Sequence, residues 1–134
     1  MKRLLLLLII MTAVFAASAK VTDTSWKDLT KDIKNHPQRI TVVDVYAVWC
    51  GPCKVYAPIF DKVAEELPQA AYYRLDIDKN EVINDYISIQ AVPTTLIFYN
   101  VKGETKPRVL TRSGLLDEEE LKLMIKKAIA MGAV

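Results

Sequence analysis

The chain has 134 residues, about half of them apolar and a quarter charged, which favours one globular domain and argues against a disordered chain. Of the 18 Lys and Arg residues, Lys2 and Arg3 stand at the amino terminus, and the other 16 balance the 16 Asp and Glu residues. This balance does not support the basic surface that nucleic-acid binding requires, and we expect no nucleic-acid partner.

The first nineteen residues have the three-part pattern of a secretory signal peptide. Two basic residues precede an apolar run of 14 residues, Leu4 to Ala17, and small residues stand at Ala17 and Ala19. The run is short for a membrane span, which takes about 20 apolar residues. We therefore expect residues 1–19 to be a cleaved signal and residues 20–134 to be one domain, periplasmic or secreted. The alternative is an uncleaved segment that anchors the domain.

The first half of the domain alternates between strand and helix patterns. A short strand around Val21 precedes a helix over 22–36, whose apolar residues recur at three- and four-residue steps. Residues 39–48 are rich in β-branched residues and almost continuously apolar, with Asp44 as the main exception. This pattern predicts a central strand that is covered on both faces. A helix over 51–67 follows it.

The second half predicts a strand over 70–78, a short helix that Asn80 caps, a hairpin and a last helix. The hairpin joins strands over 93–100 and 106–114, and the last helix covers 116–132 with three glutamates in its first turn. Helices between parallel strands, followed by a hairpin, indicate an α/β fold. We expect a central mixed sheet of four to five strands, flanked by helices on both faces.

Both cysteines of the chain, Cys50 and Cys53, lie in the sequence WCGPC at the start of the predicted helix. Unpaired backbone N–H groups and the dipole at a helix amino end stabilise an anion and favour the thiolate, which is the nucleophile. Cys53 lies one turn along the same face, so a disulfide can form with little backbone movement. Gly51 keeps bulk away from the nucleophile, and Pro52 lacks an N–H that an early helical position leaves unused.

Three other uses of the two cysteines compete with a reversible redox pair. A structural zinc site takes four ligands, whereas the chain has two cysteines and one distant histidine, His36. A structural disulfide across so small a loop stabilises a fold little. The third alternative is a pair of buried, inert side chains. We expect the redox pair and no metal.

Asp44 is the second candidate for chemistry. An acid inside a central strand is costly unless it is paired or neutral. It stands six residues before Cys50, among mostly apolar neighbours. A raised pKa would suit Asp44 to take a proton from a buried thiol and return it. The alternative is a solvated aspartate at a strand end.

The motifs WCGPCK, VDVYAVWC, RLDID, AVPT and TRSG occur in the order that thioredoxins have, and the chain resembles that family over nearly all of residues 21–132. The resemblance implies the thioredoxin fold and dithiol–disulfide exchange without a bound cofactor. It implies that Cys50 is the exposed attacking thiol and Cys53 the buried resolving thiol, and that the two form the redox disulfide. It also implies that Asp44 is the buried proton carrier.

The resemblance further implies a substrate-binding surface around the cysteines. Val92 would offer backbone hydrogen bonds to a substrate chain, and Pro93 matches a cis-proline that faces the disulfide. Arg74 lies where relatives often carry a lysine near the buried acid, and its alternative is a simple surface charge. The residues that the resemblance places at the substrate surface are Trp49, Gly51, Pro52, Val92, Pro93 and Gly114.

Together these patterns predict an exported, monomeric thiol:disulfide oxidoreductase that reduces disulfide-bonded protein substrates. Export removes the usual soluble reductase from reach, so we expect a membrane-embedded electron donor. One alternative is a disulfide oxidase or isomerase, whose relatives usually carry other dipeptides in the motif and often an inserted helical domain. The other is a non-catalytic binding module that uses the same surface.

Overall fold

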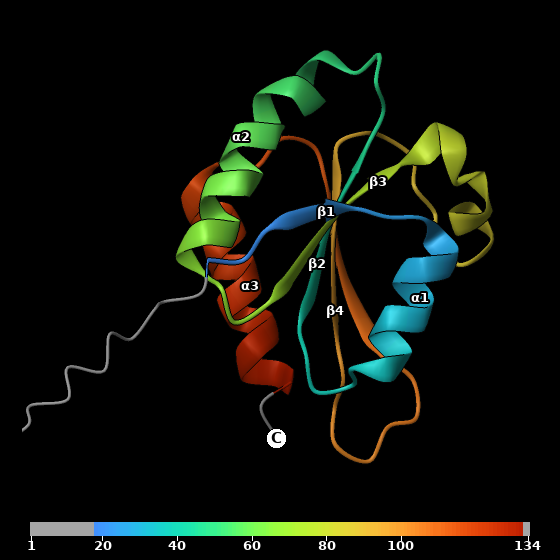
Figure 1. The fold of residues 1–134 in the computed structure, drawn as a ribbon, viewed down its shortest axis with the longest axis vertical. Coiled ribbons are helices and arrows are strands. Elements are labelled where there is room, and N and C mark those ends of the chain that lie inside the picture. The colour runs from blue at the N-terminus through green and yellow to red at the C-terminus, as the bar shows by residue number, and fades with distance from the viewer. Residues whose placement is uncertain (1–17, 133–134) are drawn as a thin grey trace, which may run out of the picture.

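One five-stranded mixed sheet organises residues 18–132, the part of the chain that the computed structural model describes (Figure 1). Its order is β1-β3-β2-β4-β5, with β3 parallel to both β1 and β2, and with β4 antiparallel to both β2 and β5. The expected mixed sheet is thereby confirmed. The strands are β1 (Val21–Asp23), β2 (Thr41–Tyr46), β3 (Ala71–Asp76), β4 (Thr94–Tyr99) and β5 (Arg108–Ser113).

Helices cover both faces of this sheet, as predicted. α1 (Trp26–Asn35) lies on one face together with two short 3₁₀ helices, η1 (Ile77–Lys79) and η2 (Glu81–Asp85). α2 (Gly51–Glu66) and α3 (Glu118–Gly132) lie on the other face, to the left of the sheet in Figure 1. The chain therefore has three layers, with the sheet in the middle.

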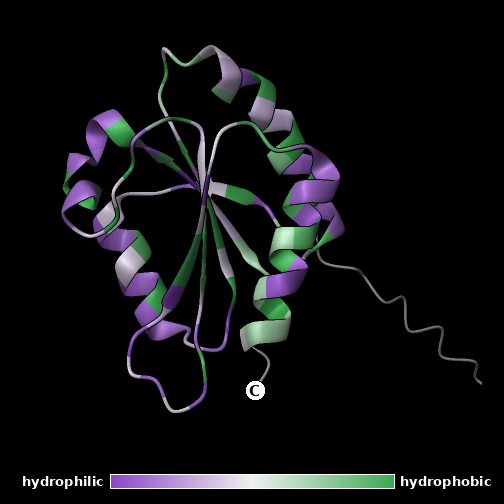
Figure 2. Ribbon diagram, turned by 180° about the vertical axis from the view of Figure 1, so that it is seen from behind, coloured by the Kyte–Doolittle hydropathy of each residue, from purple (hydrophilic) through white to green (hydrophobic). Residues whose placement is uncertain are grey.

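The alternation of side chains along the strands produces two apolar cores, because successive residues of a strand point to opposite faces. Val42 and Ile97 pack against α2 and α3, whereas Val43 and Leu96 pack on the side of α1. All four side chains are fully buried. Figure 2 shows hydrophobic residues concentrated on the central strands and hydrophilic residues on the helix surfaces and the β4–β5 loop. The continuous apolar pattern of β2 is thus explained by burial on both faces.

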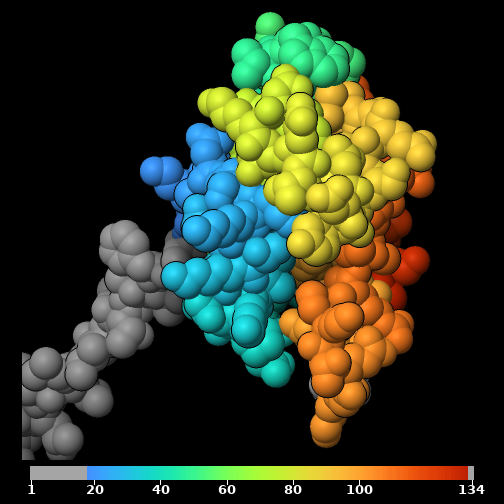
Figure 3. Space-filling view, turned by 90° about the vertical axis from the view of Figure 1, so that its right-hand side faces the viewer, coloured from blue at the N-terminus to red at the C-terminus, as the bar shows by residue number. Residues whose placement is uncertain are grey.

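The start of α2 lies at one end of the molecule. Figures 1 and 3 show it there, with the β4–β5 loop at the opposite end. Cys50 is the N-cap of α2, Pro52 lies in its first turn, and the helix continues through Pro58 for 16 residues. The link from β2 to α2 therefore presents the two cysteines at the carboxyl edge of the parallel strands.

A short helix follows Asn80 as predicted, and Asn80 stands at its N-cap position, but the side chain of this residue does not cap it. The structure has the two 3₁₀ helices there, and the Asn80 side chain makes no capping bond to η2. Its Oδ1 instead accepts a hydrogen bond from the Trp26 backbone N–H at 2.8 Å, and its Nδ2 donates to the Asp76 carbonyl at 2.9 Å. Asn80 therefore joins the end of β3 to the first residue of α1.

The predicted signal peptide lies almost entirely outside the described residues, since residues 1–17 precede them. Within residues 18–132, no helix is long and apolar enough to cross a bilayer. Cleavage after Ala19 and the alternative of an anchor both stay predictions.

Candidate active site

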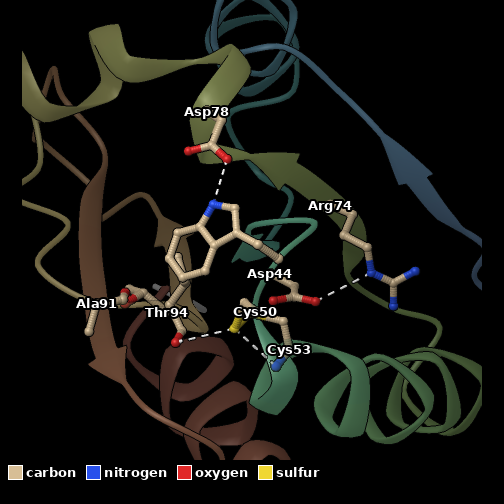
Figure 4. The surroundings of a disulfide bond; sticks show 9 residues. Asp44, Cys50, Cys53, Arg74, Asp78, Ala91 and Thr94 are labelled. Atoms are coloured by element: carbon tan, nitrogen blue, oxygen red, sulfur yellow. Dashed lines mark hydrogen bonds and ion pairs between the residues drawn. A yellow bond between two sulfur atoms is a disulfide. The ribbon is translucent and has the colours of Figure 1, made fainter.

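Cys50 and Cys53 form a disulfide at the amino end of α2, with their Cα atoms 5.3 Å apart (Figure 4). Cys50 has an extended backbone, as an N-cap residue requires, and its Sγ accepts a hydrogen bond from the Cys53 backbone N–H at 3.2 Å. The predicted position of Cys50 at the helix start is confirmed. In the reduced protein this N–H group and the helix dipole stabilise negative charge on Sγ.

Both cysteines are buried in this oxidised state, which differs from the expected contrast between an exposed Cys50 and a buried Cys53. Their exposed fractions are 3% and 4%. The reason is that the Cys50 sulfur lies against the loop before β4, 3.5 Å from the Val92 carbonyl oxygen. A sulfur in a disulfide carries no hydrogen, so this contact becomes an S–H···O hydrogen bond only when Cys50 is a thiol. The two cysteines differ in hydrogen bonding rather than in burial.

The loop before β4 approaches the disulfide through the Val92 carbonyl, and Pro93 and Gly114 lie next to this contact in the chain or through one backbone bond. The Val92–Pro93 peptide bond is cis, and the Gly114 N–H donates to the Pro93 carbonyl at 2.8 Å. Gly114 has a φ of +97°, a conformation that favours glycine, so the backbone alone explains this residue. A direct contact of these residues with substrate stays a prediction.

Trp49 provides an exposed aromatic surface beside the disulfide. Its side chain is 71% exposed, and its indole Nε1 donates to Asp78 Oδ2 at 2.8 Å. Asp78 belongs to η1, so this bond anchors the indole to the segment that follows β3 (Figure 4). At Gly51 an added Cβ would meet no atom within 4 Å, so a side chain there would stand in open space. No local pattern singled out Asp78, because it lies 29 positions after Trp49 and only the folded chain brings the two into contact.

Asp44 is completely buried, which excludes the alternative of a solvated strand-end aspartate. One carboxylate oxygen, Oδ2, lies 3.3 Å from Arg74 Nε, while the other, Oδ1, has no hydrogen-bond partner among residues 18–132. Burial raises the pKa of Asp44 to about 6, and the positive charge of Arg74 opposes this rise. The carboxyl group can therefore both take up and release a proton near neutral pH.

Arg74 is more than a surface charge, because it connects β3 to α2 and to the buried acid. Its side chain is 20% exposed, and its Nη2 donates to the Ala57 carbonyl and to Asp61 Oδ1, both at 3.0 Å. Together with Asp44 and Cys53 it lines a cavity of about 370 Å³. Such a space admits water, so a proton can pass between the thiol and the carboxyl group within it.

The chemistry that this arrangement supports is sulfur exchange with proton transfer. Two cysteines share one helix end, and Asp44, an acid with a raised pKa, lines one cavity together with Cys53. Across residues 18–132, no group of three or more His, Cys, Asp and Glu side chains could hold a metal ion. The expectation of no metal and no cofactor stays a prediction.

Comparisons with known proteins agree with this geometry. A sequence model of the Thioredoxin family matches residues 17–127. Thioredoxin-1 of Saccharomyces cerevisiae is 44% identical over 68 residues, which are 51% of this chain and 66% of the yeast protein. The thioredoxin of Rickettsia felis is 36% identical over 110 residues, 81% of this chain and 96% of the rickettsial one. The crystal structure of reduced Schistosoma mansoni thioredoxin superposes with a TM-score of 0.70 at 31% identity, over 83% of this chain and all of that chain.

The buried Asp44 predicts that the Asp44→Asn variant is more stable than the wild type at neutral pH. The pKa of Asp44 is raised from 3.8 to about 6 on folding, so its stabilising effect is complete below pH 3.8 and is lost as the pH rises through 6. The neutral amide avoids this loss, which amounts to at most about 3 kcal/mol at pH 7.5, from about 1.4 kcal/mol per pKa unit.

Urea unfolding of the oxidised proteins at pH 7.5 and pH 4 measures this effect. The variant should gain stability at pH 7.5, and the gain should shrink towards zero at pH 4. The exposed residue Asp85 supplies the matched control, because Asp85→Asn makes the same change in charge and should alter stability little at either pH. An Asp44→Asn gain of the same size at both pH values would contradict the prediction.

Proposed function

Because this chain belongs to the thioredoxin family of disulfide oxidoreductases, we propose that it acts outside the cytoplasm and reduces the disulfides of proteins. The observation that carries the proposal is the pairing of Cys50 and Cys53 at the start of α2, with Asp44 in a cavity that Cys53 also lines. We propose disulfide-bonded proteins as its substrates, a membrane-embedded protein as its electron donor and the space outside the cytoplasm as its location. The membership in the family rests on the match over residues 17–127.

Reduction starts with the Cys50 thiolate. Its Sγ attacks one sulfur of a substrate disulfide, a mixed disulfide forms, and the other substrate sulfur leaves as a thiolate that takes a proton from solvent. In this proposal the substrate chain contacts the exposed Trp49 indole and the backbone at Val92 at this stage, which the exposure of the indole and the place of Val92 beside Cys50 support. The Cys53 N–H, which donates to Cys50 Sγ, supports the anion before the attack.

The second step releases the substrate. Asp44 in its carboxylate form takes the proton from the Cys53 thiol, and the resulting thiolate attacks Cys50 Sγ. The mixed disulfide breaks, the remaining substrate sulfur leaves, and Asp44 returns the proton to it. Two electrons have then passed to the substrate, and the protein carries the Cys50–Cys53 disulfide. A membrane-embedded donor would restore the dithiol.

The direction of exchange is proposed from the residues between the cysteines, since glycine and proline there resemble reducing members of the family. The competing function is a disulfide oxidase or isomerase, which the oxidising compartment would favour. An inserted helical domain, frequent in such relatives, is not found within the described range, where η1 and η2 are the only helical segments between β3 and β4. A binding module without turnover would need neither thiol.

Export is proposed from the pattern of residues 1–19. The family match begins at residue 17, so most of this segment lies outside the matched domain. Its basic start, apolar run and small residues at the proposed cleavage site agree with a signal peptide. An uncleaved anchor would place the same domain at a membrane surface and leave the chemistry unchanged.

Trapping of mixed disulfides separates an enzyme from a binding module. With Cys53→Ser, Cys50 should form a covalent complex with a disulfide substrate such as insulin, because the resolving thiol is missing. With Cys50→Ser, the complex should be at least tenfold less abundant, because Cys53 lacks the N-cap position. Non-reducing gels and mass spectrometry measure both. Absence of a complex with Cys53→Ser, or equal amounts with both variants, would rule out the proposed exchange.

The location and thiol state of the protein in its own cells check export and direction together. We expect a processed chain that begins at Lys20, lies outside the cytoplasm and carries mostly reduced cysteines. Cell fractionation, amino-terminal sequencing and alkylation of free thiols measure these three properties. A cytoplasmic chain that keeps residues 1–19 would contradict export, and an oxidised pool that responds to no membrane donor would contradict the reducing direction.

A further inference from the structure

We propose that Asp61 is a positioning residue for the exchange reaction, because it holds Arg74 in a geometry that lets the guanidinium bind Asp44 through one nitrogen only. Asp61 lies on α2, two turns after the cysteine pair, and its side chain is 51% exposed. Asp44, on which it acts through Arg74, is completely buried. The inference rests on the proposed function and names a surface residue that regulates its proton transfer.

Arg74 binds Asp44 and α2 through different nitrogens of its guanidinium group. A guanidinium commonly binds a carboxylate with two parallel N–H···O bonds, one from each arm of its fork. Here one arm, Nη2, donates to Asp61 Oδ1 and to the Ala57 carbonyl, both at 3.0 Å. The remaining contact with Asp44 is a single bond from Nε at 3.3 Å, longer than most charge-assisted bonds. Two acceptors on α2 thus draw the guanidinium away from the buried acid.

This geometry leaves one carboxylate oxygen of Asp44 without a partner among the described residues. Its Oδ1 is buried and has no hydrogen-bond partner within the described part of the chain. A carboxylate that is paired at one oxygen only is poorly stabilised, and burial raises the pKa of Asp44 to about 6, with the negative charge of Asp61 adding to the rise. A fork bound at both oxygens would lower this pKa and make the carboxylate a weaker base for the Cys53 proton.

Arg74 is the residue that links the buried Asp44 to the exposed Asp61. The Phe60 ring lies 5.8 Å from the Arg74 guanidinium carbon, so the guanidinium packs against α2 on this side as well. No hydrogen bond or ion pair joins Arg74 to any other acid within residues 18–132. The titratable groups that face Asp44 or its cavity from the neighbouring elements are Asp23 of β1, Tyr46 of β2, and Cys53, Lys54 and Tyr56 of α2.

The test compares Asp61→Ala with Glu118→Ala. Glu118 is a matched control, because it is also an acid that pairs with a base on a neighbouring element. Its partner is Lys62 of α2, at 2.8 Å, and it makes no contact with Arg74. NMR titration of the Asp44 carboxyl group in the oxidised full-length protein is the first readout. The pH profile of mixed-disulfide resolution by Cys53 is the second. Asp61→Ala should lower both midpoints by about one pH unit, because the Nη2 N–H that bonds Asp61 becomes free to turn to Asp44 while the other stays on the Ala57 carbonyl.

Three outcomes of this comparison decide the inference. Lower midpoints in Asp61→Ala, with Glu118→Ala at the wild-type value, support it. Unchanged or higher midpoints in Asp61→Ala overturn it, as does an equal shift in both variants, which would indicate a simple effect of net charge. A loss of stability without a shift of the midpoint would show that Asp61 is only structural, and also overturns it.

A second variant keeps the test independent of the proposed function. Arg74→Met should raise the Asp44 midpoint, because it removes the positive charge that lies 3.3 Å from the carboxylate. Carboxyl titration needs no substrate and no turnover. An unchanged Asp44 midpoint in Asp61→Ala would therefore overturn the role of Asp61, even if substrate trapping through Cys50 still supported the reductase. An absence of trapped substrate would overturn the reductase and would not alter the titration result.

Discussion

The hydrogen bond from the Cys53 N–H to Cys50 Sγ is the contact on which the site depends. It exists because β2 ends at Tyr46 and α2 begins at Gly51, so that Cys50 takes the N-cap position. A helix end leaves its first N–H groups without partners, and a sulfur anion can accept from them. The same geometry places Cys53 one turn away, where its sulfur can reach Cys50. Neither cysteine needs a cofactor to be brought into contact with the other.

The buried acid shows a conflict between stability and function. Asp44 interrupts an otherwise apolar central strand, and its single bond to Arg74 does not offset its burial. A better-paired carboxylate would stabilise the fold more and accept a proton less readily. Arg74 shares its hydrogen bonds between Asp44 and Asp61, and this division keeps the buried carboxylate weakly paired and able to accept a proton. Asp61, the residue that we propose sets this division, lies at the surface.

Much of the fold could be predicted because its signals are local. The apolar run of β2, the helix that starts at the cysteines and the glutamates at the start of α3 all depend on neighbouring residues, and the structure confirms these elements. The mixed sheet and the helices on both of its faces followed from the alternation of elements, whereas the order of the strands in the sheet comes from the structure. The position of Cys50 followed from the junction of one strand with one helix.

The remaining features depend on contacts between distant parts of the chain. Asn80 bonds to Trp26 and Asp78 to Trp49, across 54 and 29 residues, so no periodicity shows them. The burial of Cys50 arises from the loop at Val92, which only the folded chain brings near. Asp61 belongs to the same group, because a surface aspartate on a helix has no local sign of a partner on β3.

The reactivity of Cys50 as a function of pH tests the central claim most directly. Alkylation of Cys53→Ser by iodoacetamide follows the thiolate of Cys50 alone, and free cysteine under the same conditions supplies the reference. Stabilisation by the helix end predicts a half-maximal rate at least one pH unit below that of free cysteine. A half-maximal rate at the same pH as free cysteine, or above it, would show that the start of α2 does not stabilise the sulfur anion, and would contradict the account.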